Sequence, residues 1–540
     1  MRTSSICSRV AAFTLTISLS WSASTGQDIK GGASTLNATD ISGGANVLLA
    51  TAEVEAKLGK GIFTAAQSKP HAIKPLEKNV LPRSIKAAHA STQTASNRTG
   101  RQPGRISGTG NIASTTGTTG TGTVNRSIDV SGAASGGTPR RALTAEDYNK
   151  QGDDLFDESK FDKAAEAYQQ AVRLKPDYAD AQLNLGETYF NLGRFDEAIA
   201  ADKQAIGLRP DWAEAYRALG TTYLKTSHSA EALEALKKAH ELDSKDAETR
   251  SALSLAYFDQ GVAAYNATRY ADAIGAYQQA VALNTNYAEA YNNLGDAYRA
   301  SGKLPEAADA YKHAVTIKPD LLETHSNLSQ VYDSLGKYYE AAEAYKQVIR
   351  LKPDDAEANN NMGYALGKSK RWQEALVAFQ RAIQLRPDYA EAYSNLGWAY
   401  NNLKNYQAAV DPLKKSIQLK SSLPEGHFNL GISYFNLKQN NEALSEFQQT
   451  IQLKPDWPAA QNNLGVAYGT LGKWKEATSA HKEAVRLSPN YGGALYNLGV
   501  DYWKTGDKKA ATAQYEKLRT LNPNNARLLY ELIYRKTPPN

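Results

Sequence analysis

A 34-residue period runs through most of this chain and constrains its fold more than any other feature. The segments KPDYADAQLNLG, KPDDAEANNNMG, RPDYAEAYSNLG and KPDWPAAQNNLG share one register. This register divides residues 145–525 into eleven units, with seven extra residues at 247–253 after the third unit. A fixed period of this length is typical of a stacked array in which each unit contacts only its neighbours.

Each unit has the pattern of a helical hairpin, with positions counted here from the first residue of the unit (Ala145 in unit one). Position 8 is Gly in ten of the eleven units, the exception being Ser329, and position 20 is Ala in all eleven. The first helix usually carries Leu at position 7 and Tyr at position 11, four residues apart on one face. We expect the small residues to let the two helices approach closely, and aromatic residues at position 24 to fill the remaining space.

Proline at position 32, present in eight units, is expected to end the second helix. The next residue is usually Asp or Asn, and in five units a Glu follows three residues later, which predicts capping boxes. The predicted pairs are Asp211 with Glu214, Asn286 with Glu289, Asp320 with Glu323, Asp354 with Glu357 and Asp388 with Glu391. These glutamates could also form a cation-attracting stripe, but a capping role already accounts for them.

The pattern resembles the tetratricopeptide repeat (TPR) family across residues 145–525. The matching residues are Leu396, Gly397, Tyr400 and Ala409 in unit eight, and Ala307, Tyr311, Ala314 and Pro319 in unit five. The resemblance implies an all-α fold, a right-handed α-solenoid (superhelix) of about eleven helical hairpins. It also implies that the first helices line a concave groove that holds peptides or protein partners.

Two segments outside the regular units have their own expected structures. Residues 526–540 predict a capping helix and tail, with Leu528, Leu529, Leu532 and Ile533 facing the last repeat. The insertion at 247–253 equals nearly two helical turns, so it could lengthen the first helix of unit four to about 247–266 without changing its phase. A surface loop is the alternative.

The candidate binding residues are asparagines at position 6 of the first helix. This asparagine ladder comprises Asn184, Asn293, Asn327, Asn361, Asn395, Asn429, Asn463 and Asn497. Asn costs up to ~0.7 kcal/mol per site relative to Ala in a helix, so its recurrence needs a reason. Position 6 lies about 100° around the helix from position 7, which is expected to turn it toward the groove. An amide complements a peptide backbone, and one Asn could bind about every third residue of an extended peptide.

This ladder resembles the TPR arm of O-linked N-acetylglucosamine transferases, in which such residues hold substrate polypeptides. Three units depart from it, because position 6 is Lys150 in unit one, Ala218 in unit three and Asp259 in unit four. The alternative is that Asn is merely a tolerated polar residue beside the Leu-Gly step of many TPRs. We therefore expect a peptide grip in units five to eleven and leave units one to four open.

The sequence predicts no enzyme, cofactor or metal site. Only fifteen residues follow the last repeat, too few for a nucleotide-sugar-binding domain. The eight histidines form no HExxH motif, and neither a phosphate-binding loop nor a G-x-S-x-G motif is present. His325 and His427 stand at position 4, often Tyr elsewhere, which predicts a packed role. We expect a non-catalytic protein-interaction scaffold, and the alternative is a detached targeting arm of a glycosyltransferase system.

The N-terminal part of the chain reads differently from the repeats. Arg2 and Arg9 precede a short apolar stretch at 10–21, and this order predicts a signal peptide at 1–24 and export to the periplasm or the exterior. Its Ser and Thr content also fits an organellar transit peptide, and a cytoplasmic location is the further alternative. Residues 25–143, rich in Gly, Ser, Thr and Ala, predict a disordered tether, with a short amphipathic helix near 47–63 as the exception.

The distribution of charged, apolar and cysteine residues restricts the kinds of partner and of structure that are expected. Residues 25–143 hold 14 Lys and Arg against 6 Asp and Glu, so the excess of basic residues belongs to the tether rather than to the repeats. A nucleic-acid-binding body would concentrate Lys and Arg on its folded part, so no nucleic-acid partner is expected. No apolar run approaches the ~18 to 20 residues that span a bilayer. The one cysteine, Cys7, excludes a disulfide framework.

Overall fold

The computed structural model describes residues 141–535. The predicted signal peptide, the predicted helix near 47–63 and all but the last three residues of the predicted tether lie outside the described residues. Within residues 141–535 the chain forms 23 α-helices and no β-strand. These helices fall into two compact units, an N-terminal unit (141–386) and a C-terminal unit (387–535).

The helices are short and alternate along the chain. The N-terminal unit contains α2 (Ala145–Asp157), α3 (Phe161–Leu174), α4 (Ala179–Asn191), α5 (Phe195–Leu208), α6 (Ala213–Lys225), α7 (Ser229–Leu242), α8 (Ala247–Asn266), α9 (Tyr270–Leu283), α10 (Ala288–Ala300), α11 (Leu304–Ile317), α12 (Leu322–Ser334), α13 (Tyr338–Leu351), α14 (Ala356–Lys368) and α15 (Trp372–Leu385). The C-terminal unit contains α16 (Ala390–Asn402), α17 (Tyr406–Leu419), α18 (Pro424–Asn436), α19 (Asn440–Leu453), α20 (Pro458–Thr470), α21 (Trp474–Leu487), α22 (Gly492–Lys504), α23 (Lys508–Leu521) and α24 (Pro523–Arg535).

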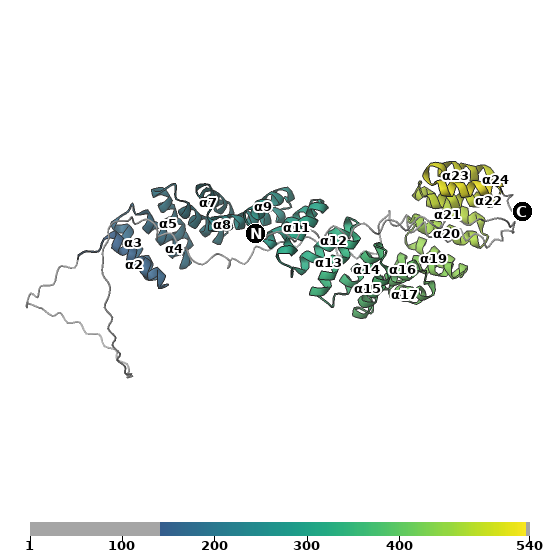
Figure 1. The fold of residues 1–540 in the computed structure, drawn as a ribbon, viewed down its shortest axis with the longest axis horizontal. Coiled ribbons are helices and arrows are strands. Elements are labelled where there is room, and N and C mark those ends of the chain that lie inside the picture. The colour runs from purple at the N-terminus through teal and green to yellow at the C-terminus, as the bar shows by residue number, and fades with distance from the viewer. Residues whose placement is uncertain (1–140, 536–540) are drawn as a thin grey trace, which may run out of the picture. The chain divides into compact units, whose positions relative to one another are not determined.

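Consecutive helices pair as hairpins in both units, as Figure 1 shows for α2 with α3 and for α22 with α23. The even-numbered helices up to α22 are the first helices of the repeats, and the odd-numbered helices are the second helices. In each compact unit, a first helix also contacts the second helix of the preceding repeat, for example α4 with α3 and α18 with α17. The predicted all-α solenoid of helical hairpins is confirmed.

The seven extra residues extend a first helix and do not form a surface loop. α8 spans Ala247–Asn266 and has 20 residues, whereas the other first helices have 13. Asp246 caps its start, accepting hydrogen bonds from the backbone amides of Glu248 and Thr249 at 3.3 and 3.0 Å.

In nine of the eleven hairpins, the core contains a contact between the glycine at position 8 and the side chain at position 24, whereas Gly499 of the last repeat lies against Leu529 of α24. A side-chain carbon on Gly295 would lie 2.6 Å from the ring of Tyr311, and one on Gly431 would lie 2.6 Å from the ring of Phe447. Such distances are too short for any residue larger than glycine, so the glycines permit the ring to lie against the first helix. Alanine at position 20 has no exposed surface in any of the eleven units.

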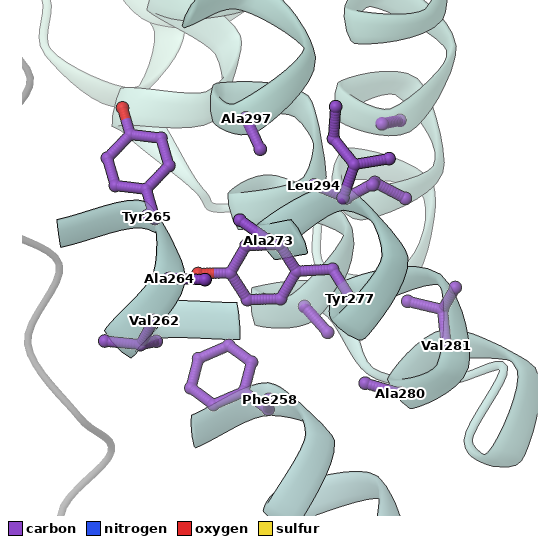
Figure 2. Packing of buried hydrophobic residues seen from close by; sticks show 13 residues of the cluster. Phe258, Val262, Ala264, Tyr265, Ala273, Tyr277, Ala280, Val281, Leu294 and Ala297 are labelled. Atoms are coloured by element: carbon purple, nitrogen blue, oxygen red, sulfur yellow. The ribbon is translucent and has the colours of Figure 1, made fainter. Parts of the chain in front are cut away.

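One hydrophobic cluster illustrates how these contacts join successive helices. Figure 2 shows the Tyr277 ring of α9 beside Phe258 of α8, with Ala273 and Leu294 in the same cluster. The ring centroids of Phe258 and Tyr277 lie 5.8 Å apart. Because Leu294 belongs to α10 and Ala310, also in the cluster, belongs to α11, the cluster joins four consecutive helices.

The turn inside each hairpin requires a left-handed residue at position 15. In the described residues with positive φ, five are glycines and six are not, including Lys404 with a φ of 60°. The Lys404 amide donates to the Asn401 carbonyl and the Asn405 amide donates to the Tyr400 carbonyl, which closes the end of α16. A left-handed conformation strains residues that carry a Cβ atom, and glycine adopts it freely.

We therefore expect Lys404→Gly to raise the free energy of unfolding by roughly 0.5 to 1 kcal/mol. The measurement is urea denaturation of the full chain. The matched control is Lys415→Gly in α17, where glycine lacks this advantage and should lower stability by about 1 kcal/mol. A Lys404→Gly variant less stable than the native chain would contradict the argument.

The predicted capping boxes are wrong. The N-cap residues are those at position 34, such as Trp212 and Tyr389, and neither makes a side-chain cap hydrogen bond. Glu289 and Glu391 instead pair with the lysine at position 31 of their own unit, Lys318 at 3.5 Å and Lys420 at 2.7 Å. Glu214 pairs with Arg217, three residues later in the same helix. Proline at position 32 lies beyond the second helices, which end at position 30, so its predicted role as a stop signal agrees with the structure.

The C-terminal helix packs as a cap, with one exception to the prediction. Leu529 and Ile533 are buried and Leu532 is partly buried in the last hydrophobic cluster. Leu528 is 42% exposed, so its expected place in the cap is wrong. The reason is helical geometry: Leu529 and Ile533 lie four residues apart on the packed face, and Leu528 lies about 100° away from Leu529.

Candidate peptide-binding face on the first helices

The asparagine ladder lies deeper in the fold than the sequence predicts. Asn184 is half-buried, and the other seven ladder residues are buried, with exposed fractions between 0% and 8%. Their amides lie against neighbouring first helices rather than on an open groove wall. The physical reason is that position 6 faces the contact between one first helix and the next within each compact unit.

The ladder amides donate hydrogen bonds to the preceding repeat. Asn184 Nδ2 lies 3.1 Å from Asp153 Oδ1 and 3.3 Å from Asn149 Oδ1, so α4 is bonded to α2. The same relation recurs where Asn327 Nδ2 lies 3.3 Å from Asp296 Oδ1, and in the C-terminal unit where Asn497 Nδ2 lies 2.9 Å from Asn462 Oδ1. The partners are the residues at positions 5 and 9 of the preceding unit.

Other ladder asparagines accept hydrogen bonds within their own helix. The Oδ1 atoms of Asn293, Asn361 and Asn463 accept from the asparagine that precedes each of them, at 3.2 to 3.3 Å. Asn463 Nδ2 is buried, and no acceptor for it is found in residues 141–535. Since an amide has two donor hydrogens and two acceptor lone pairs, these residues retain hydrogen-bonding capacity.

Tyrosines at position 24 of the second helix donate hydrogen bonds to the same aspartates on the first helices. The Tyr168 hydroxyl donates to Asp153 Oδ1 at 2.8 Å, and the Tyr311 hydroxyl donates to Asp296 Oδ1 at 2.6 Å. Each of these aspartates therefore receives a tyrosine hydroxyl from its own repeat and an asparagine amide from the next. Sequence reasoning missed this network, although Asp at position 9 together with Tyr at position 24 was the available signal.

Burial perturbs the carboxyl groups of this network. Burial raises the pKa of Asp296 to about 6, even though the hydrogen bond from Tyr311 acts in the opposite direction. At position 12 of unit six, outside the pairs at position 9, burial likewise raises the pKa of Asp333 to about 7, against the hydrogen bond from Tyr345 at 3.0 Å. The face of the N-terminal unit therefore contains carboxyl groups that are costly to ionise in the folded state.

The C-terminal unit presents an apolar row beside the ladder. Position 9 there is Trp398, Ile432, Val466 and Val500, three residues after each ladder asparagine and hence on the same helical face. Three of them are half-buried and Val466 is 9% exposed. This apolar row gives the first helices of the C-terminal unit a surface with apolar side chains next to amides, and the sequence analysis did not single it out.

The histidines at position 4 are packed, as predicted. His325 Nε2 lies 3.1 Å from the Pro319 carbonyl oxygen, and His427 Nε2 lies 3.1 Å from the Ser421 carbonyl oxygen.

Over the described residues, no three His, Cys, Asp or Glu side chains are grouped as a metal site would require. In the same part of the chain, no helix is long and apolar enough to cross a membrane.

Solved structures of other helical-repeat proteins resemble the chain. The APC/C heterotetramer Cut9–Hcn1 is 16% identical, with 73% of this chain and 97% of that chain covered and a TM-score of 0.39. Yeast Tom70 is 14% identical, with 72% and 96% covered and a TM-score of 0.36. MamA from Desulfovibrio magneticus RS-1 is 23% identical, with 31% and 95% covered and a TM-score of 0.29. No curated protein sequence gave a significant match.

Family models match most of the repeat region. The cilia and flagella-associated protein 70 C-terminal domain, a TPR model, matches residues 118–360. Four tetratricopeptide repeat models match residues 354–422, 433–472, 459–488 and 492–525. TPR folds suggest protein-interaction scaffolds and are typically non-catalytic. With the hairpin packing described above, these matches show that the chain belongs to the tetratricopeptide repeat family.

Proposed function

We propose that this protein is a non-catalytic scaffold that binds extended polypeptide along the face formed by its first helices. The observation that carries the proposal is the apolar row of the C-terminal unit beside the asparagine ladder. A folded face with half-buried Trp398, Ile432 and Val500 retains apolar surface that a bound polypeptide would remove from water.

The two sets of side chains would have different tasks. The apolar row would contact side chains of the bound polypeptide, and the ladder would hydrogen-bond to its backbone through capacity such as that of Asn463 Nδ2. Because the ladder is buried, a polypeptide meets the apolar row first. The resulting recognition depends on extended conformation and apolar content more than on one sequence.

The alternative of a targeting arm for a glycosyltransferase system gained no support from the family or structural matches. The TPR matches describe repeats only, and the asparagine ladder is accounted for in part by the hydrogen bonds between repeats. We therefore retain the scaffold alone as the proposed function.

An array of immobilised 15-residue peptides of random sequence tests the proposal with the full chain. Replacing Ile432 and Val500 together by Ser should weaken capture about tenfold or more, since each change removes roughly 1 kcal/mol of apolar contact. The matched control is Val377→Ser, because Val377 on the second helix α15 is 66% exposed and lies off this face. Undiminished capture by the folded double variant would contradict the proposed function.

A further inference from the structure

Two carboxyl groups in unit two occupy the places where other repeats hold a tyrosine and an aspartate. In units one and five, the tyrosine at position 24 donates to the aspartate at position 9. In unit two, position 24 is Asp202 on α5 and position 9 is Glu187 on α4. A donor and an acceptor are thereby replaced by two acceptors.

Unit three also lacks the asparagine amide that would donate to Glu187. Asp153 and Asp296 each receive an amide hydrogen bond from the ladder asparagine of the next repeat. The corresponding residue after Glu187 is Ala218, one of the three departures from the ladder. Glu187 therefore lacks both of the donors that its counterparts have.

Asp202 is buried with an unused oxygen. The residue is 1% exposed, and among the described residues no group donates a hydrogen bond to its Oδ1 atom. That oxygen points toward Gly186 of α4, at position 8 of unit two. In units one, four and five, a tyrosine ring packs against the glycine at this position. Burial, and then the charge of Glu187, raise the pKa of Asp202, while burial and Glu214 raise the pKa of Glu187 to about 7.

The basic residue that acts on Glu187 also interacts with other carboxylates. Arg217 on α6 acts on Glu187 and opposes the rise of its pKa. Its guanidinium lies 3.4 Å from Glu214 and 3.6 Å from Asp246, and it also pairs with Glu248. Carboxylates thus exceed cations around α4, α5 and α6, so within residues 141–535 the pair formed by Glu187 and Asp202 has no counter-ion of its own.

We propose that Glu187 and Asp202 form a subsite for the ammonium group of a lysine side chain on a polypeptide bound along the first helices. This inference rests on the proposed function and adds a preferred residue type to it. An ammonium has three donor hydrogens and can replace both the missing tyrosine hydroxyl and the missing asparagine amide. It is also a more compact charge than a planar guanidinium.

The lysine can come from a partner or from this chain itself. The segment before the repeats carries seven lysines: Lys30, Lys57, Lys60, Lys69, Lys74, Lys78 and Lys86. The chemistry of recognition is the same for both sources, and the experiment distinguishes them.

The test uses the peptide array in two copies, one with free lysines and one treated so that every lysine is acetylated. The native full chain should bind lysine-containing peptides roughly tenfold more strongly on the untreated copy, which corresponds to about 1.4 kcal/mol. The double variant Glu187→Gln with Asp202→Asn, nearly isosteric, should lose this preference and still bind the acetylated copy. Asp202→Tyr, which restores the residue of other repeats, should lose it too.

The matched control is Asp196→Asn, because Asp196 is an exposed carboxylate on the same helix α5 and should leave the preference intact. Replacing the seven N-terminal lysines by Gln assigns the source: stronger capture by peptides supports competition from the chain's own lysines, and unchanged capture supports a partner's lysine. Equal binding to both copies would overturn the subsite alone. Binding to neither copy would overturn the proposed function as well.

Discussion

Phe447→Ala should lower the free energy of unfolding of the C-terminal unit by about 3 to 5 kcal/mol. The Phe447 side chain is fully buried, fills the space over Gly431 and lies 6.0 Å from the Phe428 ring between centroids. Removing it leaves a cavity that rigid neighbouring helices cannot close. Urea denaturation of the full chain measures the loss, and Trp457, 4.4 Å from Phe428, provides a local fluorescence signal.

The matched control is Phe447→Leu. Leucine occupies the same position in unit eight, where Leu413 lies against Gly397, so it should fill most of the space and cost clearly less than alanine. An alanine variant as stable as the leucine variant would show that the ring does not hold the hairpin together.

Replacing Asn361, Asn395, Asn429 and Asn463 together by Ala should abolish measurable peptide capture and also lower stability. Loss of binding is expected because the change removes four amides from the first helices, each worth ~0.5 to 1.5 kcal/mol as a hydrogen-bonding group. Stability should fall because all four side chains are buried. The greater helix propensity of Ala, up to ~0.7 kcal/mol per site, offsets only part of this loss.

Capture on the peptide array and urea denaturation separate the two effects. The control variant carries Asn402→Ala and Asn436→Ala, because these asparagines bond to carbonyl groups of their own helices at 2.8 and 2.9 Å. It should bind peptides normally. If the quadruple variant folded and captured the same peptides at native strength, the ladder would serve only to join repeats.

The sequence predicts the hairpins well because their determinants recur every 34 residues. Gly at position 8 and Ala at position 20 are steric requirements of a close helix crossing, and the structure places both at that crossing. The extended helix α8 is also foreseeable, since seven residues nearly complete two turns. Regular local geometry and periodic packing are therefore readable from one chain.

The surroundings of the ladder are harder to predict. Asn184 bonds to Asp153, 31 residues earlier, and rotation about one helix cannot show that the neighbouring helix covers it. The capping prediction is wrong for a similar reason, since Glu391 pairs with Lys420, 29 residues later. Contacts between repeats decide burial, and they become visible only when residues one period apart are compared.

The proposed lysine subsite rests on departures from the period rather than on residues that recur. Asp202 is the one carboxylate among eleven residues at position 24, and Ala218 interrupts the ladder in the very next unit. Each departure alone has a trivial explanation. The structure brings their consequences together around Glu187, where both missing donors would have been.

The helix α24 also bears on engineering the length of the array. Its residues continue the 34-residue register, with Ala526 at position 1 and Leu532 at position 7, yet position 8 is Ile533 instead of glycine. A branched side chain at that point would keep a following second helix from closing onto α24. Ile533 thus prevents a further second helix from packing against α24. Adding another hairpin by design would first require Ile533→Gly.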